Sequence, residues 1–181
     1  ADAIMSEFDA FRNRSGETWM KSFKANQDND LVDAAGINSS RQTQWTEMLL
    51  YDRGSWLKPG CDAMPTACHV LQGRVEVEGI LHGKRSGQVS LLKLEAGTTL
   101  VPHFGSVNWR YTAHLGLVVP SNVVVKAGNT QREFARGKVL LLDDSFLHSV
   151  EHKGDGPRVT LFVNFFHPQA KPQSHDEWLK G

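Results

Sequence analysis

Cysteine is scarce in this sequence of 181 residues, in which only Cys61 and Cys68 occur. Two thiols without paired histidines at ligand spacing give little support to a structural zinc site. Their separation of seven positions in GCDAMPTACHVL would suit a small disulfide loop in an oxidising compartment. The alternative is two reduced thiols, one of them in the core. From these residues alone both states stay open.

The sequence also has no excess of charge and no long apolar run. Twenty Lys and Arg residues balance twenty Asp and Glu residues, so the basic excess of a nucleic-acid-binding protein is missing. No apolar run approaches the roughly 20 residues that span a bilayer, and no secretory signal opens the chain. We therefore expect no nucleic-acid partner and no membrane segment within these residues. Because the chain begins at Ala1 rather than Met, a preceding segment and the cellular compartment are left open.

What the sequence does have is enough apolar material for one domain, with 40% hydrophobic residues and five tryptophans. We expect a single domain over 1–181, made of a helical flank (1–60), a β core (61–170) and a tail (171–181). In the flank, apolar residues recur at helical spacing and are interrupted by RSGE, which predicts two short helices. Beyond residue 60, segments rich in Val, Leu and aromatics alternate with Gly, Asn and Asp turns, which predicts an all-β sandwich or barrel.

Strand alternation places the polar residues of two β segments on one face each. That face is formed by Thr112, His114 and Gly116 in RYTAHLGLVV, and by Arg158, Thr160, Phe162 and Asn164 in PRVTLFVNFF. The opposite faces are apolar. A barrel with a polar interior pocket needs this combination of a continuous apolar face and a mixed face bearing His or Arg. We therefore predict a ligand cavity.

A metal-binding pattern with one ligand missing lies in LVPHFGSVNWRYTAHLGLVV. His103 is followed two positions later by Gly105, where a His-x-carboxylate iron motif would have Asp or Glu. A second candidate cluster is LLLDDSFLHSVEH, in which Asp144 and His148 follow a predicted strand. Acidic residues at a strand end are often turn residues, and a lone histidine is often structural. The combination of His103, His148 and Arg158 in one predicted barrel favours a site.

Three segments together resemble a known family. PHFGSVNWRYTAHLGLVVP, GKVLLLDDSFLHSVEH and RVTLFVNFFHP are similar to the catalytic domain of the aspartyl/asparaginyl β-hydroxylases. Members of that family are iron(II)- and 2-oxoglutarate-dependent oxygenases. The resemblance runs over residues 45–168 and extends to CDAMPTAC, whose cysteine spacing fits a pair in the animal members. It implies a mainly β fold, a double-stranded β-helix of the jelly-roll or cupin-like kind, with flanking N-terminal helices.

The same resemblance assigns roles to five residues. His103 and His148 are implied to be the protein ligands of Fe(II), with Gly105 at a position where this family also has glycine. Imidazole suits Fe(II), and water and the oxygens of 2-oxoglutarate suit the remaining coordination positions. Asp144 is implied to hydrogen-bond metal-bound water, which orients a ligand that the protein does not supply. Arg158 is implied to pair with the distal carboxylate of 2-oxoglutarate, for which a planar guanidinium is suited.

The remaining site residues include two departures from the family. His114 is implied to contact the carboxylate next to the keto group of 2-oxoglutarate, and a structural histidine is the alternative. The family's substrate-binding arginine falls at Thr112, and a serine that helps to hold 2-oxoglutarate falls at Leu92, with Ser90 the nearest hydroxyl on that strand face. Arg110 is retained and is expected either in substrate recognition or in a structural ion pair. The identity of the substrate is therefore open.

The resemblance implies a dioxygenase that uses Fe(II), 2-oxoglutarate and O2 to hydroxylate an unactivated carbon. The expected target is the β-carbon of an Asp- or Asn-type residue in a peptide or protein, or a related small molecule. Two alternatives are a halogenase that binds chloride at the open position beside Gly105, and a non-catalytic binding module that keeps the fold and Arg158. In the hydroxylase, metal and cosubstrate carry the hard step while the protein orients the C–H bond.

Overall fold

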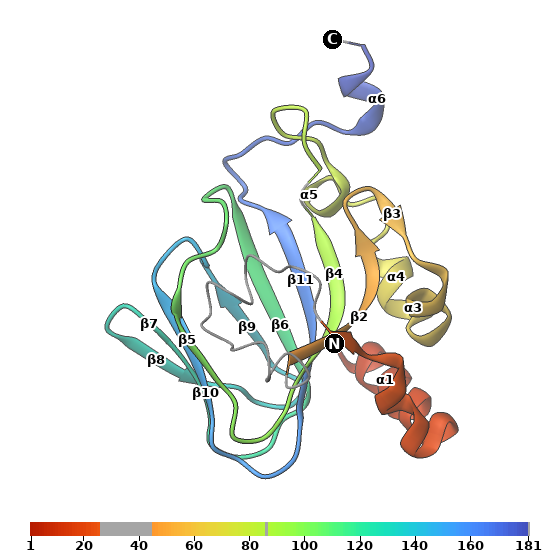
Figure 1. The fold of residues 1–181 in the computed structure, drawn as a ribbon. Coiled ribbons are helices and arrows are strands. Elements are labelled where there is room, and N and C mark those ends of the chain that lie inside the picture. Colours follow the sequence, from red (N-terminus) through yellow and green to blue (C-terminus); the bar gives the residue numbers. More distant parts are fainter. Residues whose placement is uncertain (26–44, 86, 181) are drawn as a thin grey trace.

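The computed structural model describes residues 1–25, 45–85 and 87–180, which form two antiparallel β-sheets (Figure 1). The strands of the larger sheet are β1 (Lys24–Ala25), β2 (Trp45–Asp52), β3 (Ser55–Trp56), β4 (Gln88–Leu94), β6 (Arg110–Val118), β9 (Val139–Leu142) and β11 (Arg158–Phe166). Those of the smaller sheet are β5 (Thr99–His103), β7 (Val123–Ala127), β8 (Thr130–Glu133) and β10 (His148–His152). The strand orders are β1-β2-β4-β11-β6-β9, with β3 paired to β2, and β5-β10-β7-β8.

From β4 onward the chain passes back and forth between the two sheets. β4, β6, β9 and β11 lie in the larger sheet, and β5, β7, β8 and β10 lie in the smaller one. The first and last of these eight strands, β4 and β11, are paired neighbours although they are far apart in the sequence. Eight strands wound between two sheets in this way form a double-stranded β-helix, or jelly roll. The mainly β fold and the predicted strands from residue 88 onward are therefore confirmed.

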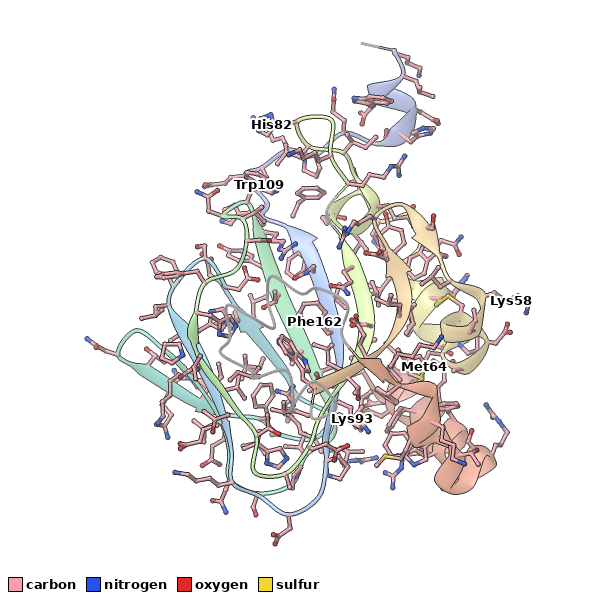
Figure 2. The ribbon with its side chains drawn as sticks, viewed as in Figure 1. Lys58, Met64, His82, Lys93, Trp109 and Phe162 are labelled. Atoms are coloured by element: carbon pink, nitrogen blue, oxygen red, sulfur yellow. A yellow bond between two sulfur atoms is a disulfide. The ribbon has the colours of Figure 1, made fainter. Side chains whose placement is uncertain are left out.

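Helices cover the outer face of the larger sheet. They are α1 (Asp2–Ser15), the 3₁₀ helix η1 (Gly16–Ser22), α3 (Lys58–Ala63) and α4 (Pro65–Leu71); α5 (Val75–Glu78) and α6 (His175–Trp178) are single turns. Phe8 of α1 packs with Leu50, Leu91 and Leu161 of the sheet, and Figure 2 shows Met64 on this helical side and Phe162 between the sheets. Each large apolar side chain buried there stabilises the fold by about 1.5–3 kcal/mol. No helix in the described ranges is long and apolar enough to cross a membrane.

The structure does not follow the predicted boundary at residue 60 between a helical flank and a β core. β2 lies in the predicted helical flank but is a strand of the larger sheet, and α3, α4 and α5 lie largely within the predicted β core. Nearly every residue of WTEMLLYD is buried, because one face meets the helices and the other faces the smaller sheet. A strand buried on both faces lacks the alternation that identifies a half-buried strand. Residues 26–44 of the predicted flank lie outside the described residues.

A disulfide joins Cys61 in α3 to Cys68 in α4, with a Cα–Cα distance of 5.7 Å. Both cysteines pack in the core between the helices and the larger sheet. The carboxylate of Glu7 in α1 accepts hydrogen bonds from the main-chain N–H groups of Thr66 and Ala67, at 2.6 and 3.2 Å. The open question between disulfide and free thiols is therefore answered by the disulfide, which stabilises the helical side of the molecule.

Replacing both cysteines with serine should lower the free energy of unfolding by about 2 kcal/mol, the value that loop-closure entropy gives for so short a loop. Urea denaturation of the Cys61→Ser/Cys68→Ser protein measures the loss. Wild-type protein under reducing conditions is the control and should lose a similar amount. Unchanged stability in both samples would contradict a stabilising role for the bond.

Candidate active site

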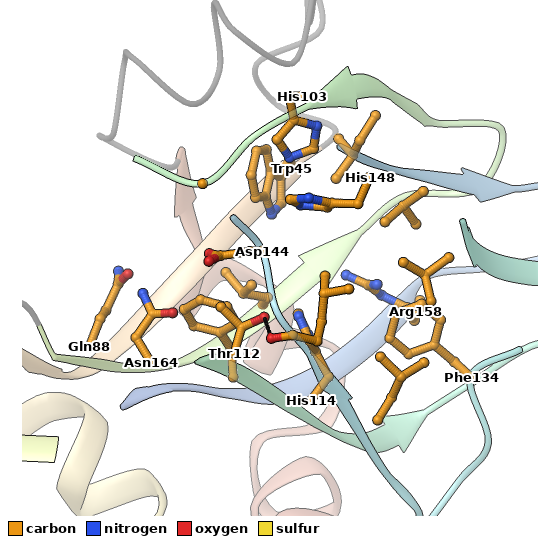
Figure 3. A pocket seen from close by; sticks show the side chains of 18 of the residues that line it. Trp45, Gln88, His103, Thr112, His114, Phe134, Asp144, His148, Arg158 and Asn164 are labelled. Carbon is orange, nitrogen blue, oxygen red and sulfur yellow. Dashed lines mark hydrogen bonds between the residues drawn. The ribbon is translucent and has the colours of Figure 1, made fainter. Parts of the chain in front are cut away.

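A cavity lies between the two sheets, and most of the predicted site residues line it (Figure 3). These are His103, Gly105, Arg110, Thr112, His114, Asp144, His148 and Arg158. The structure thus brings together residues from β5, β6, β10 and β11 and from the segments that follow β5 and precede β10. Ser90 is different: it is fully buried on the inner face of β4 but is not a lining residue, whereas Leu92 is.

Cross-strand register arranges the inner face of the larger sheet in rows. Three of these rows are Arg158–Leu94–Trp45, His114–Phe162–Ser90 and Thr112–Asn164–Gln88. The first row places Arg158 at one end of the cavity, and the third places Asn164 and Gln88 at the opposite end (Figure 3). The predicted polar faces of β6 and β11 therefore do face one cavity.

Two imidazoles meet on the smaller sheet. His103 of β5 and His148 of β10 are register partners, and their ring centroids are 4.3 Å apart. In each ring Nδ1 lies close to the carbonyl oxygen two residues earlier, 2.7 Å for Val101 and 2.8 Å for Phe146. A carbonyl only accepts, so Nδ1 carries the proton and Nε2 keeps its lone pair. Neither Nε2 has a hydrogen-bond partner within the described ranges.

Burial keeps this pair of imidazoles neutral. It lowers the pKa of both His103 and His148, and the proximity of His148 lowers the pKa of His103 further. The neutral ring is the form that binds a metal, so both nitrogens stay available where a free histidine would be protonated. Among the residues that the structure describes, no group of three or more His, Cys, Asp or Glu side chains is placed to hold a metal. This part of the chain offers two nitrogen ligands.

Gly105 makes room for the carboxyl group of Asp144. A Cβ atom at position 105 would lie 2.5 Å from Cγ of Asp144 and 2.6 and 2.7 Å from its two oxygens. The Gly105 N–H also donates to the main-chain carbonyl of Asp144, at 2.6 Å. Nε of Arg110 lies 4.0 Å from Oδ2 of Asp144. Burial raises the pKa of the Asp144 carboxyl, and Arg110 opposes that rise. An acidic group therefore occupies the space that a side chain at position 105 would need.

Gly105→Ala should push the Asp144 carboxyl aside and weaken metal binding by about 10- to 100-fold, the usual effect of losing a group that supports metal ligands. Calorimetric titration with Mn²⁺ measures the affinity. Asp144→Ala should show a similar loss, and combining the two substitutions should add little to either one. An unchanged affinity in Gly105→Ala would show that the contact with Asp144 has no part in metal binding.

Arg158 is a buried cation at one end of the cavity. Arg158 is only 2% exposed to solvent. Its Nε and Nη1 atoms have no hydrogen-bond partner in the part of the chain described. The guanidinium carbon lies 4.6 Å from the ring centroid of Phe134. Burial lowers the pKa of Arg158 to about 10, so the group stays charged at neutral pH. A buried charge without a partner is unfavourable, and a carboxylate ligand would provide both the opposite charge and the missing acceptors.

One other row of the larger sheet separates the row of His114 from the row of Arg158. Its Nδ1 is 3.3 Å from Oγ1 of Thr160. Burial, with smaller contributions from Arg158 and His148, lowers the pKa of His114 to about 3. The ring is therefore neutral at physiological pH. When the Thr160 hydroxyl donates to Nδ1, Nε2 carries the proton and can donate to an anionic ligand.

Acidification should destabilise the metal-free protein, because four histidines have lowered pKa values: His103, His114, His148 and His152. In the unfolded chain these histidines take up protons near pH 6.5, whereas in the folded protein they do so only at lower pH. The free energy of unfolding therefore falls as the pH drops below about 6.5. The loss due to His114 continues down to its folded pKa of about 3. The raised pKa of Asp144 opposes this trend in part.

Urea unfolding between pH 7.5 and pH 5 tests this pH dependence. His114 alone contributes a slope of up to about 1.4 kcal/mol per pH unit. His114→Gln should therefore give a shallower dependence than the wild type. Equal slopes for the two proteins would show that His114 is protonated alike in the folded and unfolded chains.

Sequence reasoning missed several lining residues. Trp45 lines the cavity from β2, and its buried Nε1 has no partner in the described ranges. Phe134 lies beyond β8 and contacts Arg158. Gln88 and Asn164 form part of the row with Thr112. No alternation in WTEMLLYD marks Trp45, because β2 is buried on both faces, whereas Asn164 is already on the predicted polar face.

Comparison with known proteins identifies similar chains. The family model described as Aspartyl/Asparaginyl beta-hydroxylase matches residues 1–168. The mouse protein named aspartyl/asparaginyl beta-hydroxylase is 32% identical over 137 residues, which are 75% of this chain and 18% of that protein. Aspartate beta-hydroxylase domain-containing protein 2 of Xenopus tropicalis is 30% identical over 170 residues, 92% of this chain and 42% of that protein. The chain thus spans less than half the length of these relatives.

Solved structures give a more distant likeness. A predicted oxalate decarboxylase of Thermotoga maritima has a TM-score of 0.43 and 15% identity, covering 68% of this chain and 81% of that one. The cupin domain of Schizosaccharomyces pombe Cnp3 has a TM-score of 0.43 and 9% identity, covering 70% of this chain and 67% of that one.

Proposed function

Because the chain belongs to the aspartyl/asparaginyl beta-hydroxylase family, we propose that it is an iron(II)- and 2-oxoglutarate-dependent dioxygenase that hydroxylates an unactivated carbon. The target that we propose is the β-carbon of an Asp- or Asn-type residue in a peptide or protein, or a related small molecule. The proposal depends above all on one arrangement. His103 and His148 present two unprotonated Nε2 atoms at a cavity that ends on the buried guanidinium of Arg158.

The residues present fit iron(II). His103 and His148 would hold the ion through Nε2, because main-chain carbonyls already hold the protons on Nδ1. Oδ1 of Asp144 is buried without a hydrogen-bond partner in the described ranges, so it can accept a hydrogen bond from a water molecule at the site. Iron(II) would supply the O2 chemistry that no protein side chain supplies.

The residues also fit 2-oxoglutarate. Arg158 would bind the distal carboxylate, since its buried Nε and Nη1 groups are donors without described acceptors. His114 would donate from Nε2 to the carboxylate next to the keto group. Apolar side chains from both sheets, among them Leu92, Val125 and Phe134, line the cavity and would exclude water from this end. The chain thereby orients a dicarboxylate along the axis from Arg158 towards the two imidazoles.

One observation favours hydroxylation over halogenation. The space beside Gly105, which a halogenase would use for chloride, is next to the Asp144 carboxyl. An ionised carboxylate repels chloride, whereas it accepts hydrogen bonds from water. Asp144 therefore supports water rather than a halide at that position.

Anaerobic reconstitution with Fe(II) and 2-oxoglutarate, followed by addition of O2 and ascorbate, tests the proposed function. We expect iron-dependent O2 uptake and succinate formation, and a product heavier than the substrate by one oxygen atom whether or not chloride is present. Calorimetry with Mn²⁺ and 2-oxoglutarate gives an independent measure of binding. Failure of both ligands to bind would overturn the proposal. Binding without succinate formation over a broad substrate panel would identify a non-catalytic binding module, and a chlorinated product a halogenase.

A further inference from the structure

The end of the cavity opposite Arg158 is lined by the uncharged polar side chains of Thr112, Asn164 and Gln88. We propose that this end selects an uncharged primary amide of the substrate and disfavours a carboxylate, so that an asparagine-type side chain is preferred to an aspartate-type one. The inference rests on the proposed function, because it narrows the substrate group that the same cavity accepts. It depends on three neighbouring side chains and the charges beside them.

Thr112, Asn164 and Gln88 form one row across β6, β11 and β4. Asn164 is the register partner of Thr112 on one side and of Gln88 on the other. All three line the cavity, and Figure 3 shows Gln88 and Asn164 side by side at the end away from Arg158. Because the row lies on three adjacent strands of one sheet, the three side chains are held at fixed spacing.

Asn164 presents a buried acceptor without a donor. The residue is 3% exposed, and its Oδ1 has no hydrogen-bond partner in the described ranges. Buried polar atoms in folded proteins nearly always have a partner, so an unpaired one beside a cavity indicates a group that a ligand completes. The partner must be a hydrogen-bond donor, because a carbonyl oxygen only accepts.

The neighbours of Asn164 add acceptors. The amide nitrogen of Gln88 donates to Oε2 of Glu47 at 3.0 Å, which commits one of its two N–H donors and leaves the Gln88 oxygen as an acceptor. The Thr112 hydroxyl donates to the carbonyl of Leu142 at 3.4 Å, which commits its proton and leaves its lone pairs. The row therefore offers oxygen acceptors on all three of its side chains.

The charges near the row also disfavour a carboxylate. Glu47 and Asp144 both line the cavity, and Arg110, the cation at this end, has its Nε 4.0 Å from Oδ2 of Asp144. A ligand carboxylate would bring further acceptors and one more acidic group to Glu47 and Asp144. A primary amide instead brings two N–H donors for Asn164 and its neighbours, and no charge. A site built to hydrogen-bond one group discriminates strongly against an analogue that leaves its buried atoms unpaired.

A matched pair of probes tests this inference: the N-acetyl α-amides of asparagine and of aspartate, which differ only in the side-chain amide. Their affinities are measured by ligand-observed NMR titration of the full chain loaded with Zn²⁺ and 2-oxoglutarate. We expect the asparagine probe to bind at least about tenfold more tightly. Equal affinities, a preference for the aspartate probe, or no binding of either probe at millimolar concentration would overturn the inference.

Three variants assign the preference to the row. Asn164→Leu should reduce the ratio of the two affinities to near one, and Thr112→Lys should shift it towards the aspartate probe. Asn129→Leu, in the exposed turn between β7 and β8, is the matched control and should keep the wild-type ratio. Melting temperatures confirm that each variant is folded. Failure of Zn²⁺ and 2-oxoglutarate to bind would count against the proposed function, whereas the probe ratio alone decides the amide preference.

Discussion

Arg158→Met should remove most of the affinity for 2-oxoglutarate and at the same time stabilise the ligand-free protein. Arg158 is 2% exposed, and two of its guanidinium nitrogens have no partner in the described ranges, so the folded chain bears a desolvation cost that a ligand would offset. Replacing buried charged groups with apolar side chains of similar volume is neutral or stabilising by about 1–4 kcal/mol. Methionine also keeps a favourable contact with the ring of Phe134.

The loss of binding should be large, because removing one partner of a buried, hydrogen-bonded charge pair costs about 2–5 kcal/mol. Urea unfolding without ligand and calorimetry with 2-oxoglutarate measure the two effects separately. Arg136→Met is the control, since Arg136 forms an exposed ion pair with Asp9 and should affect neither quantity strongly. If Arg158→Met lowered stability and left the affinity for 2-oxoglutarate intact, Arg158 would be a structural residue rather than an anchor for the cosubstrate.

His148→Ala should abolish iron-dependent turnover of 2-oxoglutarate, with a loss of at least about 100-fold. The described chain offers two imidazole nitrogens at this position, so the loss of one leaves a single protein ligand. Succinate formation and an anaerobic Fe(II) titration measure activity and metal affinity in the same preparation. His69→Ala, on the exposed side of α4, is the control and should behave as the wild type. Undiminished turnover in His148→Ala would remove His148 from the set of metal ligands.

The cavity could be predicted from the sequence because strand alternation has a fixed period. Once RYTAHLGLVV and PRVTLFVNFF are strands, Thr112 and His114 must share a face, and so must Arg158 and Asn164. The structure confirms both faces and pairs them across β6 and β11. This inference needs only local information, since a side chain two positions along a strand returns to the same face.

Other features depend on contacts that a sequence does not display. β2 is buried on both faces, which removed the alternation and hid Trp45 from the predicted site. The Asp144 carboxyl fills the space beside Gly105, and these two residues lie in loops that are far apart in the chain. Ser90 lies on the expected face, but whether a residue on that face reaches the cavity depends on the size of its neighbours, here Phe162. The two-residue period of a strand indicates which face a side chain is on, but not how large its neighbours are.

The carbonyl contacts of the two imidazoles have a consequence for how such a protein can diverge. The groups that orient His103 and His148 belong to the main chain at Val101 and Phe146, so no side-chain replacement at those positions deletes the acceptor. At the far end of the cavity, in contrast, the polar atoms of Thr112, Asn164 and Gln88 that a ligand would meet belong to side chains, and each can be removed by a single substitution. The orientation of the two imidazoles is therefore insensitive to side-chain replacement at Val101 and Phe146. Under the proposed function, side-chain changes at the far end would alter the substrate preference without disturbing that pair.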